Sequence, residues 1–272
     1  MQTDRSAKNG NDRAISESIG FIIIFSIIIA GIGMVTLYGY PMLLQQQSSS
    51  NEQIMEKNMI VLQNDLKSLA YKTVPYSETS LSVGGGALTV YNMTYSKGDA
   101  NFSIQDGSNQ IANADGTKPL VFYPGDLRYY STSAQTGLSL ENGAVVKNMI
   151  AETGSTMLAE PRWFYDGQTN TAVIYLIGFT TTSDIMAQTG VGTVKMDLGL
   201  TNYTSYNIPV NDRIYVTYTP NTAADYSAAW DNYFTGTLNM IPYSTGTYIL
   251  PTNLALPATL VIYQYKIEIE SV

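Results

Sequence analysis

The sequence contains no cysteine and no histidine, and only 13% of its residues are charged. Without cysteine the chain has no disulfide framework, no thiolate metal site and no cysteine nucleophile. Without histidine it lacks the commonest general base and the commonest metal ligand. We therefore expect no enzyme, no catalytic residue, no cofactor and no metal site. An extracellular enzyme that works with carboxylates alone stays open as a minor alternative.

Positive charge is also scarce, because 14 lysines and arginines face 22 aspartates and glutamates, for a formal net charge of −8. Nucleic-acid binding needs clustered basic side chains that neutralise phosphates, and the sequence has no such cluster. We therefore expect no nucleic-acid partner. Asn, Thr, Ser and Tyr supply the polar surface instead, as is common on extracellular β domains. The composition favours a binding or structural protein.

Charged residues are missing altogether from residues 18–51, and an almost unbroken apolar run occupies residues 19–44. Spanning a bilayer core of ~30 Å takes about 20 helical residues, so this run predicts a helix that anchors in a membrane or in a filament core. A secretory signal would have a shorter apolar region and a cleavage site of small residues. Residues 39–45 offer a poor cleavage site, so we expect the helix to be retained.

Three residues inside the run suggest how such a helix could assemble. Gly31 and Gly33, with Gly39 nearby, would permit close approach of other helices. Pro41 removes a backbone hydrogen bond and predicts a kink or local melting. An ordinary single-span anchor with a bend at the membrane exit is the alternative interpretation.

The helical pattern continues beyond the apolar run. Five apolar residues at spacings of 4, 3, 4 and 3 form a stripe on an otherwise polar helix: Met55, Met59, Leu62, Leu66 and Leu69. We predict that the helix ends at about Lys72, before Pro75. The stripe must be covered, either by the rest of the chain or by other copies.

The residues before the helix form a short hydrophilic leader that ends in Arg13 and Ala14, directly ahead of Ile15. This arrangement resembles the class III signal peptide of archaeal type IV pilins, members of the pilin and archaellin superfamily. In that family the leader ends in a basic and a small residue, and the apolar helix follows the cut. The resemblance covers about 20 residues of leader and helix start, and the helical pattern covers about 45 more. It implies that a prepilin peptidase cleaves between Ala14 and Ile15.

Glu17 departs from the bacterial pilin pattern, in which a glutamate stands at the fifth mature position. Cleavage after Ala14 would place Glu17 third. A lone carboxylate at the edge of an apolar run is costly unless it is paired, and the new N-terminal ammonium of the same or a neighbouring subunit could be that partner. A headgroup region or a helix N-terminus would also favour it. Both interpretations stay open.

After Pro75 the pattern changes from helical to alternating, which is typical of strands. Strands are predicted at residues 86–95, 171–179, 192–200, 213–219 and 261–270, whereas residues 96–118 resemble a surface loop. Residues 172–177 are apolar on both faces, so we expect them in the middle of the core. Asn142-Gly143 predicts a two-residue hairpin. Residues 222–234 predict a short helix, and we expect its Trp230, Tyr233 and Phe234 to plug one edge of the sheet.

These patterns predict an α+β fold: a long N-terminal hydrophobic helix followed by a mainly antiparallel, sandwich- or barrel-like β head. The expected divisions are a removed signal peptide (1–14), the helix that anchors in a membrane or filament core (15–74) and an extracellular head (75–272).

The head carries three glycosylation sequons, which begin at Asn92, Asn101 and Asn202. We predict that at least one of them is modified. Oxygen ligands at Asp106, Asn109, Asn113 and Asp115 could wrap a calcium ion, but Asp and Asn also favour turns, and we expect the turn role.

The resemblance predicts a structural subunit of an archaeal type IV pilus-like surface filament, with adhesion as a further role. Its expected partners are copies of itself or other pilins through the N-terminal helix, a prepilin peptidase, and the membrane before assembly. The expected location is the cell surface. The alternative is a minor or non-polymerising, membrane-anchored extracellular binding protein.

Overall fold

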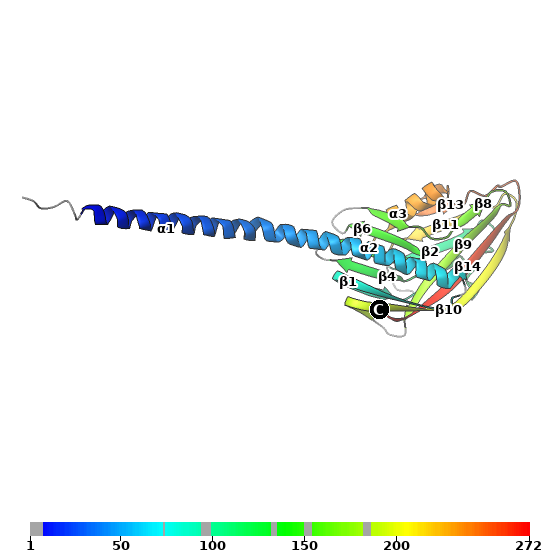
Figure 1. Cartoon of the computed structure of the whole chain (residues 1–272). Helices are drawn as coiled ribbons and strands as arrows, with labels where there is room; N and C mark the ends of the chain where they lie inside the picture. Colours follow the sequence, from blue (N-terminus) through cyan, green and yellow to red (C-terminus); the bar gives the residue numbers. More distant parts are fainter. Residues whose placement is uncertain (1–7, 73, 94–98, 132–134, 150–153, 182–185) are drawn as a thin grey trace, which may run out of the picture. The chain divides into compact units, whose positions relative to one another are not determined.

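The structure is a computed structural model of the chain, shown in Figure 1. It describes residues 8–72, 74–93, 99–131, 135–149, 154–181 and 186–272, with the backbone alone for residues 8–17. The chain divides into two compact units, Met1–Ser49 and Ser50–Val272. Each unit is described by itself.

The N-terminal part of the chain is helical from Lys8 to Lys72. It consists of α1 (Lys8–Met34), the five-residue π-helix η1 (Val35–Gly39) and α2 (Tyr40–Lys72). Residues 40–49 of α2 belong to the first unit, and residues 50–72 belong to the second. The helix ends at Lys72, as the sequence predicts.

The second unit contains two sheets. The larger sheet has nine strands in the order β7-β6-β5-β4-β1-β10-β14-β9-β8, and the smaller has five in the order β12-β13-β11-β2-β3. All pairs are antiparallel except β14 with β9, which is parallel. The strands are β1 (Tyr76–Tyr91), β2 (Asn101–Asp106), β3 (Leu120–Phe122), β4 (Asp126–Ser131), β5 (Thr136–Glu141), β6 (Ala144–Met149), β7 (Ser155–Ala159), β8 (Phe164–Asp166), β9 (Thr171–Thr181), β10 (Met186–Ile208), β11 (Ile214–Thr219), β12 (Ile241–Ser244), β13 (Thr247–Ile249) and β14 (Ala258–Ser271).

The nine-stranded sheet is the middle of three layers, because residues 50–72 of α2 cover one of its faces and the five-stranded sheet covers the other. Strand β9 shows this directly. Ala172, Ile174 and Leu176 pack in the core shared with the small sheet. Ile177 and Phe179 pack in the core shared with α2. The predicted α+β fold is therefore confirmed, and its β part is a sandwich with a helix as the third layer.

The predicted Asn142-Gly143 hairpin joins β5 and β6. Both turn residues have positive φ, 48° and 77°, as a two-residue hairpin turn requires. The turn lies beneath α2, where the Gln63 amide donates to the carbonyl oxygens of Gly143, at 2.7 Å, and Glu160, at 2.9 Å. The side-chain oxygen Oδ1 of Asn142 accepts from the backbone N–H of Ile177 at 2.8 Å. These bonds tie the helix to the middle sheet.

The predicted short helix is present as α3 (Ser227–Asn232), followed by the π-helix η2 (Tyr233–Thr237). Trp230 and Phe234 are fully buried. They pack with Phe102 and Trp163, so the aromatic plug lies inside the core shared by the two sheets.

The expected surface loop at residues 96–118 is wrong in part, because β2 lies within it and pairs with both β11 and β3. Phe102 and Ile104 are completely buried there. Their alternation with polar neighbours is a strand pattern that the surrounding Asn, Asp, Ser and Gly residues obscured.

Candidate functional site

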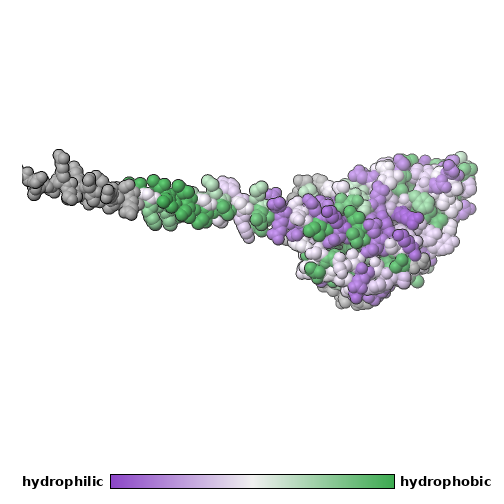
Figure 2. Space-filling view, in the orientation of Figure 1, coloured by the Kyte–Doolittle hydropathy of each residue, from purple (hydrophilic) through white to green (hydrophobic). Residues whose placement is uncertain are grey.

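The apolar part of the helix exposes its side chains on every side within the first unit. Phe21 is 69% exposed, Ile32 63% and Leu37 71%. None of the most apolar stretch of this helix is buried. In the described part of the chain this is the one helix whose length and composition would let it cross a membrane. Figure 2 shows the hydrophobic surface along it. Such a surface requires lipid or other apolar helices as its environment.

The serine and threonine hydroxyls within this segment are satisfied by the helix itself. Ser26 Oγ donates to the Ile22 carbonyl oxygen at 2.7 Å, and Thr36 Oγ1 donates to that of Ile32 at 2.9 Å. Each bond reaches back four residues, which is a common arrangement for these side chains in helices. The segment can therefore enter an apolar environment without stranding either hydroxyl.

Gly31 and Gly33 have open surroundings, since an added Cβ at either position would meet nothing within 4 Å. Packing within the chain therefore gives no reason for glycine at these positions. The predicted role, close approach of neighbouring helices, stays a prediction.

Pro41 lies at the start of α2, and the helix continues through it rather than melting. The helix geometry changes instead in the π-helix η1 directly upstream. There the Tyr40 N–H donates to the Val35 carbonyl oxygen, five residues back. A proline ring clashes with the carbonyl four residues earlier, and a wider π turn is one way for a helix to accommodate an interrupted hydrogen-bond ladder.

The predicted processing residues Arg13, Ala14 and Ile15 lie on the backbone of α1, as does Glu17. Their side chains lie outside the described part of the structure. Cleavage after Ala14 and pairing of Glu17 stay predictions.

The apolar stripe on α2 is covered by the head of the same chain. Its five residues, Met55, Met59, Leu62, Leu66 and Leu69, are all completely buried against the nine-stranded sheet. Lys147 of β6 also bridges Glu52 and Glu56 of α2, each at 2.7 Å. The stripe therefore needs no cover from other copies, and only the upstream apolar segment is left without one.

The head buries a polar cluster between its two sheets. Glu141 is 1% exposed, and one of its oxygens accepts from Trp230 Nε1 at 2.9 Å and from the Tyr218 hydroxyl at 3.0 Å. Asp126 accepts from Arg128 Nε at 2.8 Å and from Ser139 Oγ at 2.6 Å. Burial, reinforced by the negative charge of Asp126, raises the pKa of Glu141 to about 8. Glu141 is therefore mostly protonated at neutral pH.

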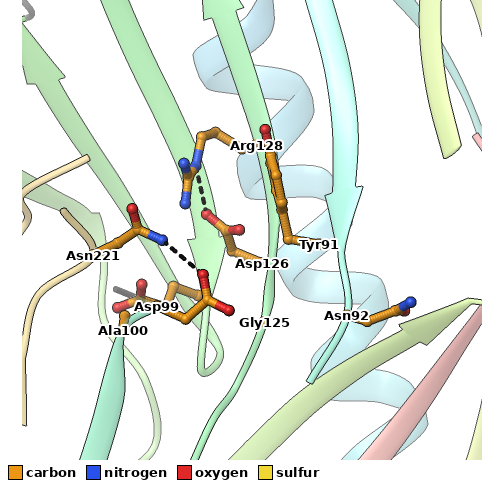
Figure 3. A pocket seen from close by; sticks show the side chains of 9 residues that line it. Tyr91, Asn92, Asp99, Ala100, Gly125, Asp126, Arg128 and Asn221 are labelled. Atoms are coloured by element: carbon orange, nitrogen blue, oxygen red, sulfur yellow. Dashed lines mark hydrogen bonds and ion pairs between the residues drawn. The ribbon is translucent and has the colours of Figure 1, made fainter. Parts of the chain in front are cut away.

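Figure 3 shows the small cavity beside this cluster, with Arg128 turned toward Asp126 and Asn221 toward Asp99. Its volume is about 10 Å³, which is room for about one water molecule. Among the described residues no group of three His, Cys, Asp or Glu side chains could hold a metal ion. The cluster can join β4, β5, β11 and α3, but its cavity cannot admit an organic substrate.

A row of tyrosines crosses the α2-facing side of the middle sheet. The ring of Tyr263 stacks on those of Tyr175 and Tyr203, with centroids 5.0 and 5.6 Å apart. The guanidinium of Arg162 lies over the ring of Tyr71, 4.8 Å from its centroid. A groove of about 380 Å³ opens beside the row, lined by Leu69, Ala70, Leu198, Thr201, Asn202, Tyr203, Tyr263 and Tyr265. The stacked rings cover part of one another, but Tyr203 is still 63% exposed.

Residues 13–270 match a single sequence family, so the match includes both the helix and the head. The chain belongs to DUF7289, a family of unknown function. No curated protein and no solved structure matches the chain.

The three sequons of this DUF7289 protein differ in accessibility. The side chain of Asn202 is exposed on β10, whereas that of Asn101 is half-buried at the start of β2. Asn92 is half-buried, and its amide oxygen accepts from the backbone N–H of Thr181 at 2.6 Å. Thr94 of that sequon lies outside the described residues. Asn202 is therefore the sequon most open to modification.

The predicted turn role of Asp106 agrees with its hydrogen bonds. Its carboxylate accepts from Ser108 Oγ and from the backbone N–H groups of Gln110 and Ile111. Asp115 likewise accepts from the backbone and the hydroxyl of Thr117. These bonds occupy oxygens that would otherwise be offered to calcium.

Sequence reasoning missed Gln63, Glu141 and Arg162 in the DUF7289 head. Glu141 ends a strand as an ordinary surface residue would. For Gln63 the helical spacing offered a signal, since it lies four residues after Met59 and three before Leu66, on the stripe's side of the helix. Glu141 and Arg162 contact residues that are far from them in the sequence, so no local pattern predicts their roles.

Proposed function

We propose that this DUF7289 protein is a structural subunit of a type IV pilus-like surface filament, with its apolar helices packed inside and its β heads outside. One observation carries the proposal. The helix has two parts of opposite character. Residues 50–72, the lower half, are covered by the head of the same chain, whereas residues 19–44, the upper half, expose apolar side chains on every face. The upper half needs cover from elsewhere, and other copies of the same helix can supply it.

The length and chemistry of the upper half support this function. Its 26 residues, 19–44, would extend about 39 Å as a helix, more than the ~30 Å of a bilayer core. The hydroxyls of Ser26 and Thr36 are satisfied internally, and open space surrounds Gly31 and Gly33. A head-to-tail array of such helices can bury this surface along an open filament. The Arg13-Ala14 leader, which resembles that of pilins, supports processing before assembly.

The second candidate function is a membrane-anchored extracellular binding protein that does not polymerise. Lipid alone could cover the same apolar surface, and the helix is long enough to span a bilayer with some tilt. In that case the two glycines would have no partner helices. The two functions therefore differ in what changes at Gly31 and Gly33 should do.

The test replaces Gly31 and Gly33 together by Leu in the full chain, in its native host. We expect the double variant to insert in membranes at the normal level but to form at least tenfold fewer filaments, because the leucines would keep neighbouring helices apart. Ile27→Leu with Ile29→Leu is the matched control, since it alters the same helix without closing the open positions. Electron microscopy of sheared surface material gives the count. If deletion of the protein leaves filament number and length unchanged, the anchor is the better account.

A further inference from the structure

Strand β10 has a long edge that none of the other described strands covers. Its first half pairs on one side with β1, in a ladder that ends at Tyr76 opposite Asp197. Its second half pairs with β14, from Lys195 to Ile208. On the side away from β14, none of the described strands pairs with Thr201–Ile208. In Figure 1 this yellow half of β10 lies outermost, next to the red β14. At every second residue the backbone N–H and C=O groups point outward along this edge.

The terminal strands of the two sheets are short or interrupted. Strands β3 and β8 have three residues each, β12 has four and contains Pro242, and β7 has five. The unpaired segment Thr201–Ile208 of β10 has eight residues, which read TNYTSYNI and include no charge, proline or glycine. Natural proteins normally place charged residues or proline on an exposed edge, because an open edge is a template for pairing with another strand. This edge therefore has the character of an interaction surface.

We propose that the β10 edge of a second copy of this chain pairs with it, antiparallel and about a two-fold axis, so that two large sheets become one. A second copy fits because the segment is uncharged in a chain whose net charge is −8, and like charges facing each other across strands would oppose pairing. Thr, Ser, Asn and Tyr also pair favourably with one another across antiparallel strands. Tyr203 is 63% exposed and Leu200 75%, so the two copies would cover apolar surface as well.

The symmetry makes a geometric prediction. A two-fold axis that relates antiparallel neighbours stands perpendicular to the sheet, so each sheet face continues into the same face of the partner. Residues on opposite strands can be partners only when their side chains lie on the same face, and side chains alternate in strict period two. The axis must therefore pass between one residue and its own copy. One position between 201 and 208 should face itself.

The absence of cysteine from the chain allows a direct test with single-cysteine variants of the full chain at each position from 201 to 208. Expression in membranes of a host without N-glycosylation or a pilus assembly system separates this pairing from the proposed filament and from modification of Asn202. We expect one dominant position for disulfide-linked dimers, because only directly opposed residues place their Cα atoms at a disulfide distance of about 5.5 Å. Tyr243→Cys is the matched control for Tyr203→Cys, since the two tyrosines are 61% and 63% exposed but Tyr243 lies on the proline-containing β12.

The dominant variant should give at least tenfold more dimer than Tyr243→Cys. Adding Thr201→Lys with Asn207→Lys should reduce that dimer at least tenfold, because pairing would bring the like charges of the two copies close together along the edge, whereas Thr201→Gln with Asn207→Gln should leave it unchanged. Equal dimer yields at all positions, a yield no higher than that of Tyr243→Cys, or insensitivity to the lysines would overturn the proposal. Failure of the helix to form filaments would not affect this result.

Discussion

Glu141 illustrates at the scale of single residues how a buried acid can be tolerated in a core. Hydrogen bonds from Trp230 and Tyr218 and the nearby Arg128 favour its charged form, but burial and the charge of Asp126 outweigh them and raise its pKa to about 8. In the unfolded chain its pKa would be near 4.5. The folded protein therefore binds this proton more tightly than the unfolded chain does.

We predict that the head loses stability as pH rises from 5 to 9. Below pH 4.5 Glu141 is protonated in both states, and between the two pKa values only the folded state keeps the proton, so each pH unit lowers the free energy of unfolding by about 1.4 kcal/mol. The chain has no histidine to titrate in the same window. Urea unfolding of the full chain in detergent at several pH values measures the slope.

Glu141→Gln is the control for this pH dependence. Its amide oxygen can accept from Trp230 and Tyr218 without carrying a titratable group, so the variant should lose most of the slope between pH 5 and 8. Equal slopes in the two proteins would show that Glu141 ionises normally.

At the scale of elements, the N-terminal helix is one stretch of secondary structure with two different requirements. Leu62 is completely buried against the nine-stranded sheet, whereas Ile24 on the same helix is 61% exposed. Leu62→Ala should therefore lower the free energy of unfolding of the head by about 2–5 kcal/mol. Ile24→Ala, the matched control, should leave it within roughly 0.5 kcal/mol. Denaturant unfolding followed by tryptophan fluorescence compares them, and equal losses would contradict the division of the helix.

The elements also show which features a sequence can reveal. The stripe from Met55 to Leu69, the end of the helix and the Asn142-Gly143 hairpin were predicted because each depends on residues a few positions apart. Strand β2 was missed because turn-forming neighbours surround its two buried apolar residues. The three-layer arrangement and the parallel β14–β9 pair depend on contacts between segments about 90 residues apart in the sequence, and periodicity does not encode such partners. The polar cluster around Glu141 is hidden for the same reason.

At the scale of the whole molecule, two segments of the N-terminal helix have different roles. Residues 50–72 complete the head, and residues 19–44 present an apolar surface to their surroundings. The family match from residue 13 to residue 270 spans both parts. The proposed filament and the proposed β10 pairing use separate surfaces, so they can be tested separately.

Mass spectrometry of the N-terminus of this protein in sheared, purified surface filaments tests the central claim most directly. The account predicts that the filaments contain the chain, that it begins at Ile15, and that residues 19–44 are still present. Filaments that never contain this protein would contradict the account. So would a surface form that begins at Met1 or near residue 48, because the helix would then be either unprocessed or removed.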